Sequence, residues 1–397
     1  AGTPDKPTII MPGGVTLAVE NGEDTAKIQS IGSRFAQNEV TLEYAQDVGC
    51  RSCASPGGGC QFLGTAGTSQ VIAESLGMTL PHAALTPSGT NLWIDTGRRS
   101  AIALKNLIDK NIKTKDILTS RAFENAMIVH AACGGSTNLI LHLPAVAHAI
   151  KEKIMKVEDW IRINKLTPRL VDVLPNGPKG FPTSVFFSAG GVPEVMLKLR
   201  DEGLLNLDVT TSTGLTLNEN LDWWEQSEKR DFVRKQLKNT RNIDPEDVVN
   251  SFQNSKKKNM TSTVTFPKGN IAPEGSVVKS TAIDKTVIDD DGVYRKIGPA
   301  RIFISEADAI KAVKDKGANG VKAGDIMVVV CGGPKGTGMQ EVAQITIALK
   351  YLNHGKEVAL ITDGRFSGVS TGACIGHIGP EALDGGPIGK LKENDLI

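Results

Sequence analysis

Long apolar runs and long charged tracts are both missing from this 397-residue sequence. No apolar stretch approaches the roughly 18 residues that a membrane-spanning helix needs, and the first ten residues lack the basic and apolar regions of a signal peptide. The formal net charge is +1, and the basic run at 256–258 resembles a solvated linker more than a binding patch. The composition therefore favours neither a nucleic-acid nor a membrane partner and predicts a soluble cytoplasmic protein.

Cysteine is also scarce. Six cysteines in a chain of this length do not make a disulfide scaffold, so each is expected to be buried, reactive or a metal ligand. Cys133, Cys331 and Cys374 lie in small-residue or apolar runs, which predicts that they are buried.

The remaining cysteines, Cys50, Cys53 and Cys60, lie close together in CRSCASPGGGC. Three such thiols could hold zinc or an iron-sulfur cluster, although a four-ligand site would need a partner from elsewhere. Cys60 is the best ligand candidate because it follows three glycines and precedes an expected helix, where backbone amides and the helix dipole favour a thiolate. For Cys50 and Cys53, packing in a turn is an equally good alternative.

Histidine occurs only six times, and three of the six surround the sequence GGSTN. His130, His142 and His148 do not have the i, i+4 spacing of a zinc-binding helix. We therefore expect them to be interior or surface residues rather than ligands. Ser136 or Thr137 is expected to cap the helix that follows.

Glycine, by contrast, is abundant, and two glycine loops organise residues 325–370. The pattern predicts buried strands at 326–330 and 358–361, with an intervening helix whose apolar positions are 339, 342, 345 and 349. Parallel strands of such a β-α-β unit bring both loops to one edge of the sheet, where ligands usually bind. The loops carry Lys335, Thr337, Glu341, Asp363, Arg365 and Ser367.

These loops do not match a nucleotide-binding motif. GGPKGTG lacks the spacing of a Walker A loop, and no GxGxxG sequence with a suitably placed acid follows a strand here. Ordinary tight turns remain an alternative explanation for each loop.

The rest of the chain predicts an N-terminal α/β domain with a parallel sheet, at 1–257, followed by a β-rich, barrel-like domain at 258–397. An opening strand is expected at 8–11, and the strand-rich pattern begins after a polar stretch at 239–260. Because a strand lies at each end, both ends are expected to be cut, with the second domain incomplete at its C-terminus. Helices are predicted at 26–37, 65–76, 98–109, 120–132, 137–150, 193–202 and 219–238.

Several motifs in order resemble one known family over essentially the whole chain. VHAACGGSTNLILHLPAVAH, GNIAPEGSVVKSTAI, GTGMQE and TDGRFSGVSTGACIGHIGPEA are similar to sequences of the dihydroxy-acid and sugar-acid dehydratases, which include 6-phosphogluconate dehydratase. GGGCQFLGTAGTSQV, EDWIRINKLTPRLVDVLPNGP and ENLDWW most resemble the D-xylonate dehydratases of that family.

The resemblance implies a cofactor pair, a [2Fe-2S] cluster and a Mg2+ ion, and a role for three residues. Cys60 matches the third cluster cysteine, Glu341 the Mg2+-binding glutamate and Ser367 the catalytic base. The family's first two cluster cysteines and its other metal ligands would precede Ala1, and no CDK motif is present. The 397 residues alone are therefore expected to be inactive.

The expected activity is that of a hydro-lyase converting an aldonic acid such as D-xylonate into a 2-keto-3-deoxy acid. The resemblance also implies a small-molecule sugar-acid substrate and a homo-oligomer. The alternatives are another sugar acid or dihydroxy acid as substrate, an inactive fragment without a complete cluster site, and a phosphate- or nucleotide-binding module built on the glycine loops.

Overall fold

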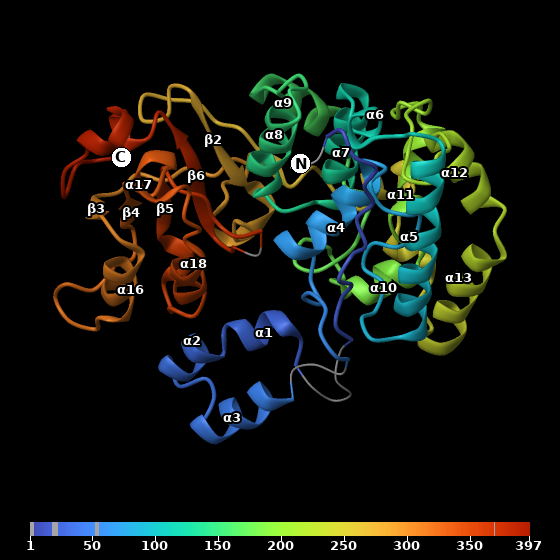
Figure 1. Ribbon diagram of the computed structural model, residues 1–397. Coiled ribbons are helices and arrows are strands. Elements are labelled where there is room, and N and C mark those ends of the chain that lie inside the picture. The colour runs from blue at the N-terminus through green and yellow to red at the C-terminus, as the bar shows by residue number, and fades with distance from the viewer. Residues whose placement is uncertain (1–3, 18–22, 52–54, 369) are drawn as a thin grey trace. The chain divides into compact units, whose positions relative to one another are not determined.

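The chain folds into two compact units (Figure 1). The computed structural model describes residues 4–17, 23–51, 55–368 and 370–397. The first unit comprises Ala1–Ile28 and Cys50–Ser262, and the second comprises Gln29–Gly49 and Thr263–Ile397. Helices together with a six-stranded, mostly parallel sheet confirm the predicted mixed α/β class.

Helices dominate the first unit. In its described part, extended segments pair only through isolated bridges, such as those of Val15 with Gly59 and Pro87, so the parallel sheet belongs to the second unit. The helices are α4 (Thr65–Ser75), α5 (Asn91–Asp109), α6 (Thr114–Ile117), α7 (Ser120–Cys133), α8 (Leu139–Ala149), α9 (Val157–Leu166), α10 (Thr183–Ser188), α11 (Gly191–Asp201), α12 (Leu217–Glu225), α13 (Glu228–Arg241), α14 (Pro245–Val248) and α15 (Phe252–Lys257).

Most predicted helices of this unit are present, because their end signals act as expected. Helix α4 ends at Ser75, one residue before the predicted end, and Gly77 follows with φ +76. The prediction of one helix over 219–238 is wrong. The chain forms α12 and α13 instead, because Ser227 caps a new helix by accepting the N–H of Arg230 at 3.2 Å.

The strand predicted at 8–11 is also absent. Ile10 makes one backbone hydrogen bond, from its N–H to the carbonyl of Met78 at 2.8 Å, and its own carbonyl accepts the Thr79 hydroxyl at 3.0 Å. The segment is therefore extended but is held by a loop rather than by a ladder of strand pairs.

A six-stranded sheet forms the centre of the second unit, in the order β1-β2-β6-β5-β4-β3. Strands β3 to β6 run parallel, whereas β2 runs antiparallel to both β1 and β6. Beside β3, the N–H and carbonyl of Gly298 exchange hydrogen bonds with Ile397. The strands are β1 (Val264–Thr265), β2 (Gly275–Lys279), β3 (Ala300–Phe303), β4 (Ile326–Val329), β5 (Ala359–Thr362) and β6 (Ala373–Gly379).

The predicted β-α-β unit is confirmed as β4, α18 and β5, with the two strands parallel, but α18 begins at Ala343, so the predicted helical positions 339 and 342 precede it. Helices α16 and α18 pack against each other in this unit (Figure 1). The helices are α2 (Ile31–Ala36), α3 (Leu42–Cys50), α16 (Glu306–Lys314), α17 (Pro334–Thr337) and α18 (Ala343–Lys350), while α1 (Thr25–Gln29) spans the boundary between units.

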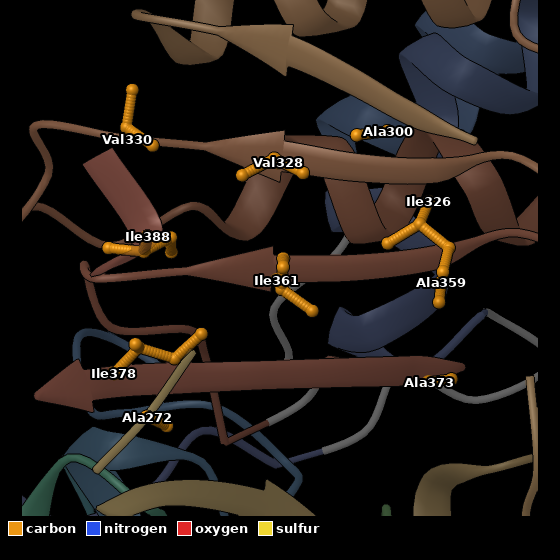
Figure 2. Packing of buried hydrophobic residues seen from close by; sticks show 10 residues of the cluster. All are labelled: Ala272, Ala300, Ile326, Val328, Val330, Ala359, Ile361, Ala373, Ile378 and Ile388. Carbon is orange, nitrogen blue, oxygen red and sulfur yellow. The ribbon is translucent and has the colours of Figure 1, made fainter. Parts of the chain in front are cut away.

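Apolar side chains cover both faces of the central strands. Ile326, Val328 and Ile361 belong to the cluster on one face (Figure 2). The alternate residues Met327 and Leu360 are also buried, so β4 and β5 are enclosed on both sides, as the apolar sequence runs predicted.

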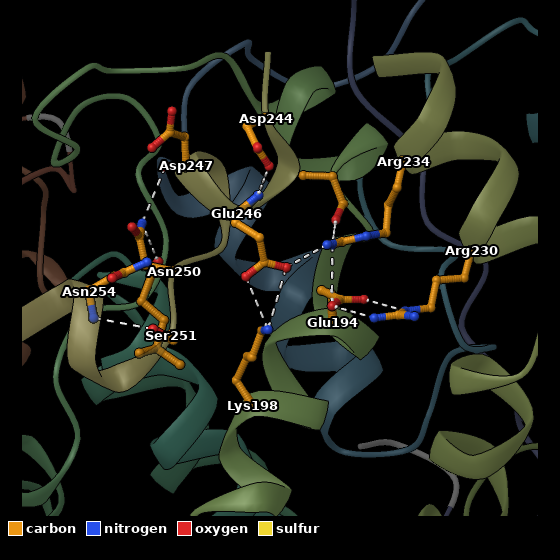
Figure 3. A network of polar contacts seen from close by, with 12 residues as sticks. Glu194, Lys198, Arg230, Arg234, Asp244, Glu246, Asp247, Asn250, Ser251 and Asn254 are labelled. Carbon is orange, nitrogen blue, oxygen red and sulfur yellow. Dashed lines mark hydrogen bonds and ion pairs between the residues drawn. The ribbon is translucent and has the colours of Figure 1, made fainter. Parts of the chain in front are cut away.

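A polar network stabilises part of the first unit (Figure 3). The buried Glu194 carboxylate of α11 accepts Arg230 Nε at 2.8 Å and Nη2 at 2.9 Å, and Arg234 lies within ion-pair distance at 3.2 Å. Arg234 also binds Glu246 at 2.6 Å. Because a buried carboxylate needs partner charges or hydrogen-bond donors, these contacts join α11 to α13 and the segment that follows it.

Candidate active site

The backbone on both sides of Cys60 is held in place by hydrogen bonds. Before it, Gly59 donates its N–H to the carbonyl of Gly14 at 2.8 Å and accepts the N–H of Thr16 at 2.9 Å. The carbonyl of Cys60 itself accepts the Thr183 hydroxyl at 3.2 Å. The half-buried thiol is therefore presented by a fixed peptide, a few residues before α4 begins.

The second of the three glycines before Cys60 is required by geometry. Gly58 has φ +85, and a Cβ there would lie 2.5 Å from Ser88 Oγ and 2.7 Å from the carbonyl carbon of Val15. Only glycine fits both the backbone conformation and the space.

The GGSTN loop lies beside the start of α4. Thr65 and Ser136 hydroxyl oxygens are 3.1 Å apart, and the Asn138 side-chain amide donates to Thr65 Oγ1 at 2.7 Å. The Ser136 N–H donates to Thr68 Oγ1 at 3.1 Å. These contacts gather hydroxyl and amide groups of the kind that bind hydroxylated substrates, in the same unit as Cys60.

The predicted cap of α8 differs in detail. The residue at the N-cap position is Asn138, which makes no side-chain capping bond. Ser136 Oγ instead accepts the N–H of Asn138 itself, at 3.3 Å, while also contacting Thr65. The side chains of the loop thus bind residues of α4 and do not cap α8.

His130 is an interior residue, as predicted. Its Nε2 lies 2.8 Å from the carbonyl of Ser136, its ring packs edge-on to Trp160, and burial lowers its pKa to about 4. His148 is exposed and His142 is half-buried. His130 is therefore neutral and supports the GGSTN loop.

The cysteines outside the candidate site are only partly as predicted. Cys133 and Cys374 are buried, and burial raises the pKa of both thiols. Cys331 is half-buried rather than buried, because it follows β4 at the carboxyl ends of the strands, where its φ is +66. Cys53 and the side chain of Cys50 lie outside the described residues.

Glu341 and Ser367 lie on neighbouring segments of the second unit. Glu341 pairs with Arg365 in a parallel bridge, and the Val342 N–H donates to the Arg365 carbonyl at 2.9 Å. Ser367 follows two residues later and is 9% exposed. The sheet thus brings together these two predicted residues at the carboxyl ends of β4 and β5, as the sequence pattern indicated.

Backbone N–H groups at the start of the GGPKGTG loop already donate hydrogen bonds to carboxylates of this chain. Asp363 accepts the N–H groups of Cys331 at 3.2 Å and Gly332 at 2.9 Å, and Glu381 accepts that of Lys335 at 2.9 Å. The Lys335 ammonium pairs with Asp384. A phosphate would have to displace carboxylates from the same donors, so this loop does not favour nucleotide binding.

Lys279 is a further residue near Ser367. Its side chain is 5% exposed, and Nζ donates to the carbonyl of Gly368 at 2.7 Å. Sequence reasoning missed it because it lies in β2, far from the glycine loops. Its one sequence signal is a charged residue at the end of the otherwise uncharged strand GSVVK.

The predicted metal ligands are of suitable types but do not form complete sets. Cys60 offers a soft thiol and Glu341 a hard carboxylate, which suit an iron-sulfur cluster and Mg2+ respectively. Over the described ranges, no three His, Cys, Asp or Glu side chains gather as a metal site. The described residues alone therefore do not fit either group.

Among the described residues, no helix has the length and apolar character needed to cross a bilayer.

Family models match both parts of the chain. The model for the dihydroxy-acid/6-phosphogluconate dehydratase N-terminal domain matches residues 1–220, and the corresponding C-terminal model matches residues 247–397. The chain belongs to the dihydroxy-acid/6-phosphogluconate dehydratase family.

Individual relatives narrow the similarity. The chain is 59% identical over 393 residues to D-xylonate dehydratase YagF of Escherichia coli K12, covering 99% of this chain and 60% of the relative. D-xylonate dehydratase YjhG of the same organism is 59% identical over 391 residues, covering 98% and 59%. A dihydroxy-acid dehydratase of Leifsonia xyli is 39% identical over 391 residues, covering 98% and 64%. The chain thus spans about 60% of the length of the D-xylonate dehydratases that it matches.

Proposed function

We propose that the complete protein is a hydro-lyase that dehydrates an aldonic acid such as D-xylonate to a 2-keto-3-deoxy acid. One observation carries this proposal: the chain is 59% identical to two D-xylonate dehydratases across nearly its whole length. Identity falls to 39% against a dihydroxy-acid dehydratase, which favours a sugar acid over a branched dihydroxy acid.

The reaction removes a proton from C2 and hydroxide from C3. We propose Ser367 as the base at C2, which requires its hydroxyl to lose a proton. A nearby positive charge favours that ionised form, and the Lys279 ammonium lies 2.7 Å from the carbonyl oxygen of the next residue, Gly368. Burial of Ser367 keeps water away and strengthens the effect of that charge.

We propose that Thr65, held in place by the buried Ser136 and Asn138, contributes to binding the hydroxyl groups of the substrate. Their side chains form a connected group at the start of α4. A polyhydroxylated chain needs several donors and acceptors that are already positioned, because each unmatched hydroxyl loses its hydrogen bonds to water.

We propose a [2Fe-2S] cluster and Mg2+ as cofactors of the complete protein. Cys60 would supply one ligand to the cluster and Glu341 one ligand to Mg2+. A homo-oligomer remains a proposal on family grounds.

A substrate comparison tests the proposed function. The protein expressed from its complete reading frame is reconstituted anaerobically with iron, sulfide and Mg2+, then offered D-xylonate, 6-phosphogluconate and a branched 2,3-dihydroxy acid. Formation of 2-keto acid is followed as its semicarbazone. We expect the largest kcat/KM for D-xylonate; a larger value for the branched acid would overturn the assignment of substrate class.

A further inference from the structure

Four consecutive amides of the loop after α4 are bound by two side chains of that helix. Glu74 accepts the N–H groups of His82 at 2.7 Å, Ala83 at 3.2 Å and Ala84 at 2.8 Å. Gln70, one turn earlier on the same face of α4, accepts the N–H of Leu85 at 3.0 Å. The conformation of 82–85 therefore depends on α4.

The bound loop continues into the backbone that pairs with the cysteine loop. The Val15 N–H donates to the carbonyl of Thr86 at 3.1 Å, and the Ser88 N–H donates to the carbonyl of Val15 at 2.9 Å. Val15 bridges in parallel to Gly59, the residue before Cys60. Three segments, at 14–16, 57–59 and 86–88, thus lie side by side with Val15 in the middle.

Gln70 also connects α4 directly to the segment at 14–16. Its side-chain amide donates to the carbonyl of Gly14 at 2.9 Å, the same oxygen that accepts the Gly59 N–H at 2.8 Å. Close packing leaves little slack, since a Cβ on Gly14 would lie 2.2 Å from the carbonyl oxygen of Thr86. A shift of 82–86 must therefore be passed on to the segment beside Cys60.

A carboxyl group suits this position better than the carboxamide of a glutamine. Its two oxygens can accept three N–H groups, whereas a glutamine offers one acceptor oxygen and presents N–H groups of its own to the same donors. Burial raises the pKa of Glu74 to about 7 against the opposing effect of these three hydrogen bonds. The nearby Lys229 ammonium also favours the ionised form.

We propose that Glu74 is a positioning residue for Cys60, acting through the loop at 82–88 and the segment at 14–16. The proposal rests on the proposed ligand role of Cys60, but it concerns the geometry of the thiol before any cluster binds. It extends the cysteine site to a buried residue more than a dozen positions further along the chain.

The test measures the reactivity of the Cys60 thiol in the complete protein prepared without metal, at pH 8. Iodoacetamide labelling is timed for wild type and Glu74→Gln, and Cys60 is followed separately from other cysteines by peptide mass spectrometry. Glu194→Gln is the matched control, because Glu194 is also buried in the same unit but binds Arg230 and Arg234 instead of the loop. Amide hydrogen exchange at 14–16 and 82–88 is measured in parallel.

We expect Glu74→Gln to accelerate Cys60 labelling by about fivefold or more, with faster exchange at both segments, because several hydrogen bonds are lost together. Glu194→Gln should lower Tm without this change. Equal labelling of wild type and Glu74→Gln would overturn the proposal, as would equal acceleration by both variants.

If Glu74→Gln does not fold, Gln70→Met is used instead, because it removes the hydrogen bonds of the half-buried Gln70 to Gly14 and Leu85. We again expect faster Cys60 labelling than in wild type, and equal labelling, or equal acceleration by Glu194→Gln, would overturn the proposal. No dehydratase assay enters this experiment. Failure of the positioning proposal is thus distinguishable from failure of the proposed function.

Discussion

At the scale of the residue, Cys60 is fixed by its backbone, so its substitution tests the thiol itself. Cys60→Ser in the complete protein should abolish the visible absorbance of an iron-sulfur cluster and lower the bound iron, because an alcohol oxygen is a poor replacement for a thiolate ligand. Iron and acid-labile sulfide analysis measures the effect. Cys331→Ser, at a half-buried thiol in the other unit, should retain both. Wild-type iron in Cys60→Ser would remove Cys60 from the cluster.

Glu341 allows a separate test of the Mg2+ proposal. Glu341→Gln preserves the size of the side chain but removes its charge, so it should lose activity by about 100-fold or more while the cluster absorbance stays. The kcat and the iron content of the same sample are compared. Activity within a few fold of wild type would reduce Glu341 to a structural role beside Arg365.

At the scale of the element, the loop between α7 and α8 has little room. A Cβ on Gly135 would lie 2.5 Å from His130 Cδ2 and 2.8 Å from Thr68 Cγ2. Gly135→Ala should therefore destabilise the protein by about 1 to 3 kcal/mol, the usual cost of overpacking. Denaturant unfolding measures the loss. Gly13→Ala, where a Cβ would have nothing within 4 Å, is the control; equal stability of the two variants would contradict the packing argument.

Helix α4 also carries a titratable group with a definite pH signature. Burial raises the pKa of Glu74 to about 7 from its ordinary 4.5, so between these values the folded protein binds more protons than the unfolded chain. Its contribution to stability is full below pH 4.5 and is lost as pH rises through 7. The stability of wild type relative to Glu74→Gln should therefore fall by about 3 kcal/mol between pH 4.5 and 7.5.

Chemical unfolding of both proteins at several pH values measures this difference. His130, whose pKa is lowered to about 4 in the same unit, has the opposite sign: its contribution is present above pH 6.5 and is lost on acidification. Because His130 is common to both proteins, it cancels in the comparison. A pH-independent difference would contradict the account of Glu74.

The sequence predicted some helices and strands of these units correctly and others not. Helix α4 and the β4-α18-β5 unit follow from apolar spacing and glycine stops. The break between α12 and α13 depends on one serine cap inside a continuous charged pattern, which periodicity alone does not reveal. Glu74 left no signal because its partners are backbone amides, which exist only once the chain has folded.

At the scale of the whole molecule, the candidate residues divide between the two units. The first carries Cys60 and the group around Thr65, and the second carries Glu341, Ser367 and Lys279. Sequence patterns placed Glu341 and Ser367 at one sheet edge, because parallel strands bring their carboxyl ends together. The position of Lys279 could not be predicted in the same way, since β2 is not part of the β-α-β unit and pairs with β6 instead.

The incomplete ligand sets lead to a prediction about the 397 residues alone. With one matched cluster cysteine and one matched Mg2+ ligand, they should show no D-xylonate dehydration after reconstitution, because a single carboxylate does not hold Mg2+ against water. The protein from the complete reading frame, treated identically, is the control. Turnover by the 397 residues on the order of 1 per second would contradict the ligand argument.

The most direct test of the proposed dehydration follows the atoms of D-xylonate. The complete, reconstituted protein is incubated with D-xylonate in D2O, and the product is analysed by NMR and mass spectrometry. Loss of the C3 hydroxyl gives an enol that takes a proton from solvent, so we expect a 2-keto-3-deoxy acid with one deuterium at C3. A product that keeps its C3 hydroxyl, or unchanged D-xylonate, would contradict it.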